Sequence, residues 1–249
     1  MNTSKTPLLF ALVAAVMCWL LPFGRLIAYP FSLFVTIVHE GGHVVMALLT
    51  GSEVFSMAIA PDASGLTITA PNSLLAGILI ANAGYLSATA YGTIVLWLAN
   101  RHTDNRKILQ FSAILVIVLV AFFTVFVKDW FATLWASGSH ISLGMKLFTI
   151  LAGGLIALCL WLIAHAKNPA IVDFVANFLA LECIFNGLGD IKTVLALSVY
   201  STSHSDAQQL AELTGIPSVV WAVGWGVISL WVIGLTVKAV LNHRGKGRA

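Results

Sequence analysis

His39, Glu40 and His43 form the pattern H-E-x-x-H inside an apolar run, residues 31–50, that is long enough to cross a bilayer as a helix. Residues four apart on a helix share a face, so both imidazoles can bind one zinc ion while Glu40 lies beside them. Zinc lowers the pKa of a bound water toward about 7, and a neighbouring glutamate can accept its proton. Such groups are costly at membrane depth unless they serve a function. We therefore interpret His39 and His43 as metal ligands and Glu40 as a general base; the alternative is two histidines that hydrogen-bond to neighbouring helices.

A catalytic zinc ion usually takes three protein ligands and keeps one position open. The acidic and imidazole candidates for the third ligand are Glu53, Asp62, Glu182, Asp190, His204 and Asp206. His204 and Asp206 lie in a polar stretch where solvation explains them, whereas Glu182 and Asp190 lie in an apolar segment. We predict Asp190 as the third ligand. Asn186, one turn earlier on the same face, could donate a hydrogen bond to the ligand, to water or to a substrate carbonyl. The alternative for Asp190 is a salt bridge with Lys192.

The composition points to a membrane protein, because 59% of the residues are hydrophobic and only 9% are charged, against about 25% charged in an average soluble domain. The expected fold class is an all-α polytopic membrane protein with about six to seven transmembrane helices, in one domain over residues 1–249 with a basic tail at about 242–249. The Lys and Arg residues lie mainly in loops and in the tail, which suits lipid headgroups and not nucleic acid. Their distribution predicts a cytoplasmic C-terminus. The expected location is a bacterial-type inner membrane.

The apolar segments are residues 8–23, 31–50, 73–99, 108–127, 143–165, 170–200 and 216–241. The first could be a signal peptide, but no cleavage site follows it, so we favour a retained span. Pro30 is expected at the entry to the motif helix, and Gly51 at its end. Gly187 and Gly189 would allow a kink or break in the segment 170–200. Residues 130–142 are expected at the membrane interface.

Two shorter stretches differ from the spans. Residues 54–70 carry β-branched residues around P-D-A-S-G and predict a short membrane-associated β-hairpin. Its free edge could bind an extended peptide by strand addition; the alternative is a simple interfacial loop. Residues 201–213 are the most polar stretch, in which Ser205 or Asp206 could cap a short helix.

Taken together, the chain resembles the site-2 proteases, a family of intramembrane zinc metalloproteases. The resemblance rests on H-E-G-G-H (39–43), on the small-residue stretch A-G-Y-L (83–86) and on the late N-G-L-G-D (186–190). It implies zinc bound by His39, His43 and Asp190, with Glu40 as the base. The prolines of the family's third motif are absent, Ile191 follows Asp190, and no peptide-binding domain is inserted between the spans.

The expected function is therefore that of an intramembrane zinc metalloendopeptidase, with Zn²⁺ as cofactor and the transmembrane segments of membrane proteins as substrates. Two alternatives remain open from the sequence. One is a catalytically inactive relative with a binding or regulatory role; the other is a metal transporter that uses the same residues.

Overall fold

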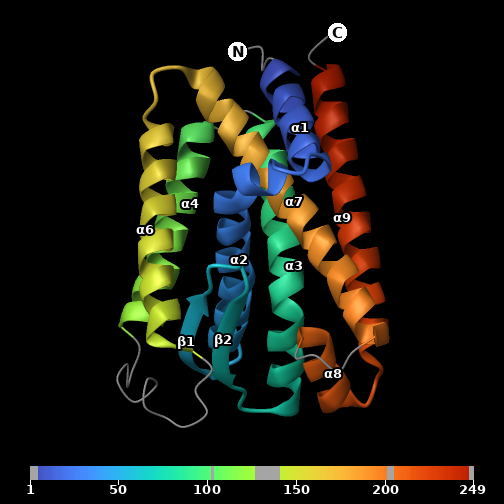
Figure 1. Cartoon of the computed structure of the whole chain (residues 1–249). Coiled ribbons are helices and arrows are strands. Elements are labelled where there is room, and N and C mark those ends of the chain that lie inside the picture. The colour runs from blue at the N-terminus through green and yellow to red at the C-terminus, as the bar shows by residue number, and fades with distance from the viewer. Residues whose placement is uncertain (1–4, 102–103, 127–140, 201–204, 247–249) are drawn as a thin grey trace.

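The computed structural model describes residues 5–101, 104–126, 141–200 and 205–246, and in these ranges the chain is helical apart from one hairpin (Figure 1). Six of the described helices are long and apolar enough to cross a membrane, which confirms the predicted fold class. These spans are α2 (Gly24–Leu49), α3 (Leu74–Ala99), α4 (Asn105–Val120) with its π-helical continuation η1 (Ala121–Val125), α6 (Leu143–Ala164), α7 (Pro169–Tyr200) and α9 (Ser218–Lys246). Most of the predicted interfacial segment 130–142 lies outside the described residues.

The first apolar segment forms α1 (Lys5–Leu20), which is apolar but shorter than the six spans. At about 1.5 Å per residue, a helix of this length falls short of the roughly 30 Å hydrocarbon core. It packs mainly against α7. In the described structure α1 therefore packs against the spans and is not counted as one of them.

Helix α2 occupies the middle of the bundle, with α3 and α7 packed beside it (Figure 1). Helices α4 and α6 pair on one side, and α9 lies against α3 and α7 on the other. Apolar side chains on the outer helices are exposed, among them Leu151 on α6 and Val227 on α9. An exposed apolar surface of this kind is expected where helices face lipid. The polar residues of α2 therefore lie at the centre of a membrane-embedded bundle.

Helix α2 begins at Gly24 and contains Pro30 within it, so the prediction that Pro30 stands at the helix entry is wrong. A proline inside a helix removes one backbone donor and favours a bend, but six further residues precede Pro30 in the same helix. The C-terminal prediction is confirmed: α2 ends at Leu49, and Gly51 adopts a φ of +68°, in the left-handed region that favours glycine.

The predicted hairpin is confirmed as β1 (Glu53–Ile59) paired antiparallel with β2 (Gly65–Ala70). Neighbouring helices cover the outer edge of β1: the Thr149 hydroxyl accepts a hydrogen bond from the Ile59 amide (2.8 Å), and the Thr124 hydroxyl donates to the Met57 carbonyl (2.6 Å). Within the described residues, no strand pairs with the other edge of β2. One edge is thus satisfied by protein, as membrane depth requires, and the other is left free.

Helix α7 continues through Gly187 and Gly189 without a break. Both glycines make room for neighbouring helices, because a Cβ at Gly189 would collide with the Trp19 ring of α1 and one at Gly187 would press on the Thr89 hydroxyl of α3. The glycines of this segment therefore serve close packing.

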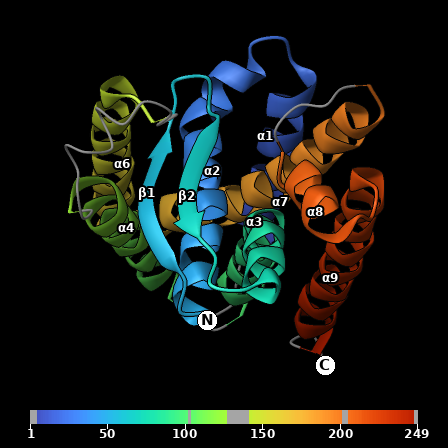
Figure 2. The ribbon, with the colours of Figure 1, turned by 90° about the horizontal axis from the view of Figure 1, so that it is seen from below.

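The polar stretch contains the short helix α8 (Asp206–Thr214), and the prediction of a cap at Ser205 is confirmed, since the Ser205 hydroxyl accepts a hydrogen bond from the Gln208 amide (3.2 Å). Ala207 and Leu210 are fully buried, and α8 packs against α3 and α9. Figure 2 shows that α8 and the hairpin lie at the same end of the bundle.

Candidate metal centre

His39 and His43 lie one turn apart on α2, and their Nε2 atoms are 3.3 Å from each other. The Nδ1 atom of His43 is 2.7 Å from the Ile80 carbonyl oxygen on α3. A carbonyl can only accept, so Nδ1 carries a proton and donates it, and in the neutral ring the Nε2 lone pair is then left for a metal. The ring of His43 is thereby held in the tautomer that a metal ligand needs.

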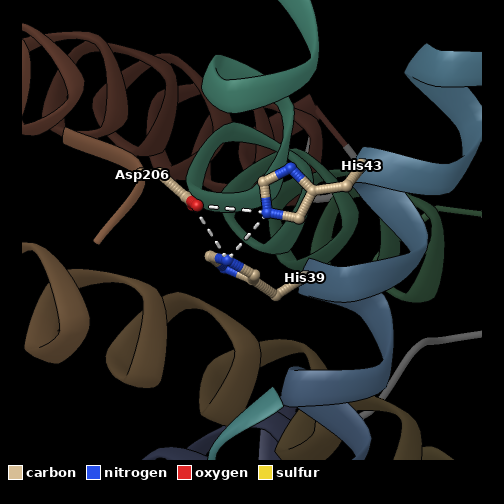
Figure 3. A group of neighbouring side chains, drawn as sticks. All are labelled: His39, His43 and Asp206. Atoms are coloured by element: carbon tan, nitrogen blue, oxygen red, sulfur yellow. Dashed lines mark hydrogen bonds and ion pairs between the residues drawn. The ribbon is translucent and has the colours of Figure 1, made fainter. Parts of the chain in front are cut away.

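The carboxylate that meets the two imidazoles belongs to Asp206, at the first position of α8 (Figure 3). Its Oδ2 lies 3.2 Å from His39 Nε2 and 3.3 Å from His43 Nε2. Burial disfavours its charged form, but His43 and His39 outweigh burial and hold the pKa of Asp206 below its ordinary value. In the described residues Oδ2 makes no hydrogen bond, so it is directed at the imidazoles alone.

The spacing of these atoms can be tested against a zinc ion. Four ligands at 2.0–2.1 Å in a tetrahedron lie about 3.3–3.4 Å from one another. The three donor atoms of His39, His43 and Asp206 are 3.2–3.3 Å apart. Two imidazole nitrogens and one carboxylate oxygen are also a ligand set that catalytic zinc uses. The three residues fit a zinc ion in both spacing and chemistry.

The predicted third ligand, Asp190, is not a member of this group. It lies on α7, close enough to His39 for their charges to interact, but it lines a different cavity. No ion pair joins it to Lys192 among the described contacts. The sequence argument placed Asp190 beside the histidines, and the structure brings Asp206 there instead.

The other predicted candidates also lie elsewhere. Asn186 donates hydrogen bonds to the Glu182 carboxylate (3.1 Å) and accepts one from the Ser32 hydroxyl (3.3 Å). Glu53 is exposed at the start of β1. Asp62 accepts hydrogen bonds from the Ser64 hydroxyl and amide, which hold the pKa of its carboxyl below the usual value. His204 lies outside the described residues.

Glu40 is buried beside the histidines, with an exposed fraction of 5%. Its Oε2 accepts a hydrogen bond of 2.6 Å from the Thr67 hydroxyl on β2. Gly65 lies directly against the same carboxylate, where a Cβ would collide with it. Helix α2 and strand β2 together therefore fix the orientation of Glu40.

A cavity of about 460 Å³ lies between β2 and α8. Glu40, His43 and Asp206 line one part of it, and residues 65–69 of β2 line another. The free edge of β2, the carboxylate of Glu40 and two members of the His-His-Asp group, His43 and Asp206, thus share one cavity, which a polypeptide in extended form could enter.

The small-residue stretch of α3 supports His39. The Tyr85 ring meets His39 edge-on at 4.7 Å between centroids and stacks on Trp225 at 4.6 Å. The Trp225 indole N–H donates to the Asn82 side-chain oxygen (2.7 Å). This aromatic stack therefore connects α9 and α3 to His39. The sequence did not reveal it, because Trp225 is 143 residues from Asn82.

Gly84→Ala is expected to disrupt the metal centre, because a Cβ at Gly84 would collide with the Nε2 atoms of both His39 and His43. Zinc affinity, measured on purified protein by competition with a chelator, should fall at least about tenfold, the loss that follows when the groups around a metal ligand are changed. Gly154→Ala on α6 is the matched control, since nothing lies within 4 Å of a Cβ there. Equal zinc affinity in the two variants would contradict the close approach.

The long apolar helices and the partly buried His-His-Asp group with an adjacent glutamate define a multi-pass membrane protein with a candidate metal centre. The chain belongs to the Peptidase M50B-like family, whose profile matches residues 8–236. Searches of curated proteins and of solved structures returned no match. The family assignment confirms the resemblance to the site-2 proteases and indicates a membrane metallopeptidase.

Proposed function

We propose that this protein is an intramembrane zinc metallopeptidase that hydrolyses peptide bonds in or next to the transmembrane segments of other membrane proteins. The observation that carries the proposal is the triangle of donor atoms from His39, His43 and Asp206, at the spacing of zinc ligands and beside Glu40. Asp206 takes the place that the sequence argument gave to Asp190.

Zinc held by these three residues would polarise the scissile carbonyl and lower the pKa of a water molecule toward about 7. Glu40 accepts the proton of that water and later delivers it to the leaving amine. The Thr67 hydroxyl holds the Glu40 carboxylate in place during both transfers. The Ile80 carbonyl keeps the His43 ring in its ligating tautomer.

The free edge of β2 suggests how a substrate is aligned. A helical peptide buries its backbone groups in its own hydrogen bonds, so a transmembrane segment must unwind before it can be cleaved. An extended segment can pair with the unpaired edge of β2 and satisfy its backbone there. This pairing would lay the substrate along the cavity that Glu40 and Asp206 line. The Lys and Arg distribution supports a cytoplasmic C-terminus.

The proposal is tested by metal analysis and cleavage assays on the purified full-length protein in lipid nanodiscs. We expect zinc in the purified protein and cleavage of some members of a panel of transmembrane peptides. Removal of zinc with a chelator should abolish cleavage, and added zinc should restore it. Absence of both zinc and cleavage would support an inactive relative, and zinc flux into proteoliposomes without cleavage would support a transporter.

A further inference from the structure

A second cavity, of about 640 Å³, lies between α1, α2, α7 and the turn of the hairpin. Glu182 and Asn186 of α7 line its inner part, opposite Ser32 and Thr36 of α2. Arg25 and Lys192 also line this cavity, and both are exposed. The polar stripe on α7 thus faces a cavity that the proposed chemistry does not use.

The side chain of Glu182 indicates that this cavity binds a ligand. Its side chain is fully buried, with an exposed fraction of 0%. Oε2 accepts a hydrogen bond from the Asn186 amide (3.1 Å) and the Trp19 side chain also approaches the carboxyl group, but no donor among the described residues lies within hydrogen-bonding geometry of Oε1. A buried carboxylate oxygen without a donor is costly, so a group that donates a hydrogen bond to it would be bound favourably.

The cavity ends within one helical turn of the catalytic residues. Thr36 precedes Glu40 by four residues on α2, and its hydroxyl donates to the Ala63 carbonyl at the hairpin turn (2.8 Å). Gly65, two residues further along the chain, lies against the Glu40 carboxylate. A substrate strand that follows the edge of β2 past Glu40 would therefore pass into this second cavity.

Resting on the function proposed above, we propose that the Glu182–Asn186 part of this cavity is a substrate subsite. It binds a side chain that donates a hydrogen bond, such as the amide of asparagine. Ser32, which forms a hydrogen bond with Asn186, marks the position of this subsite on α2. It lies two turns, or about 12 Å, from Glu40 along the helix. At about 3.3 Å per residue of an extended chain, the bound side chain belongs to a residue between about two and four positions from the scissile bond.

The test uses one transmembrane peptide that the wild-type protein cleaves. Leu, Asn or Asp is placed at each position within four residues of the scissile bond, and kcat/KM is measured in nanodiscs. The three side chains are similar in size, and only Asn carries an amide donor. At one position on one side of the bond, Asn should exceed Leu at least about tenfold, and Asp should show no gain.

Glu182→Leu should abolish the gain from Asn, so that the Asn and Leu peptides are cleaved at similar rates, and measurable cleavage of both shows that the variant is folded. Glu53→Leu is the control, because Glu53 lies on β1 outside both cavities, and it should keep the gain. If Glu182→Leu does not fold, Glu182→Gln gives the same answer. The Gln carboxamide can donate as well as accept, so Asn and Asp peptides should be cleaved at similar rates.

A gain from Asn that persists in Glu182→Leu, or an Asn to Asp ratio unchanged in Glu182→Gln, would overturn the subsite. Cleavage by the wild type with no positional preference would overturn the subsite alone. A wild type that binds zinc and cleaves no peptide would overturn the proposed function and the subsite with it.

Discussion

Glu40→Gln is expected to lower kcat for peptide cleavage by about 10³-fold while the protein keeps its bound zinc. Glutamine has the size of glutamate and can still accept the Thr67 hydrogen bond, but it cannot take a proton from water. General acid–base catalysis contributes about 10² to 10⁴ in rate, which sets the size of the effect. The measurement is cleavage of one transmembrane peptide alongside zinc content, on wild type and variant prepared in the same way.

The control for Glu40→Gln is Glu53→Gln, which makes the same change at an exposed position outside the cavity of the metal centre. It should keep both cleavage and zinc. Cleavage by Glu40→Gln at the wild-type rate would show that another group is the base. Loss of zinc together with activity would show that Glu40 holds the metal centre together, and the assigned role would then fail.

Asp206→Ala is expected to lower zinc affinity at least about 100-fold and to abolish cleavage at ordinary zinc concentrations. The change removes one of three protein ligands, which is more severe than the tenfold to 100-fold loss caused by changes around a ligand. It also removes the carboxylate that forms ion pairs with His39 and His43 among the described residues. Zinc affinity is measured by competition with a chelator of known affinity, and cleavage is measured in the same samples.

Asp190→Ala is the matched comparison, because Asp190 is the carboxylate that sequence reasoning favoured and it lies outside the His-His-Asp group. Its zinc affinity should stay within a few-fold of the wild type, since it interacts with His39 only at longer range. The reverse result, with zinc lost in Asp190→Ala and kept in Asp206→Ala, would show that α8 is not part of the metal centre.

Features set by local pattern could be read from the sequence. The apolar runs predicted a helical membrane bundle, and the spacing of His39 and His43 placed both imidazoles on one face of a helix, because helical geometry alone decides this. The hairpin at 54–70 and the cap at Ser205 were also predicted from neighbouring residues. In each case the forces that form the element act within a few residues of chain.

Local pattern also misled in two places. Pro30 suggested a helix entry, yet the helix begins six residues earlier, at Gly24, and in this first stretch Gly24 and Ala28 are buried in the bundle. Gly187 and Gly189 suggested a kink or break, yet they make room for Trp19 and Thr89 from other helices. A glycine permits several structures, and the packing partner decides among them.

The sequence by itself determined the class of protein and the placing of His39 and His43, with Glu40 beside them, on one helix. Only the tertiary structure decided which carboxylate meets them. Sequence reasoning ranked Asp190 above Asp206 by the cost of a charge in an apolar segment. At Asp190 this cost is reduced, because the side chain is exposed in a cavity. Asp206 instead reaches the histidines because Ala207 and Leu210 anchor its short helix in the bundle. Asp206 lies more than 160 residues away from His43 in the sequence, and no rule of local spacing can bring such residues together.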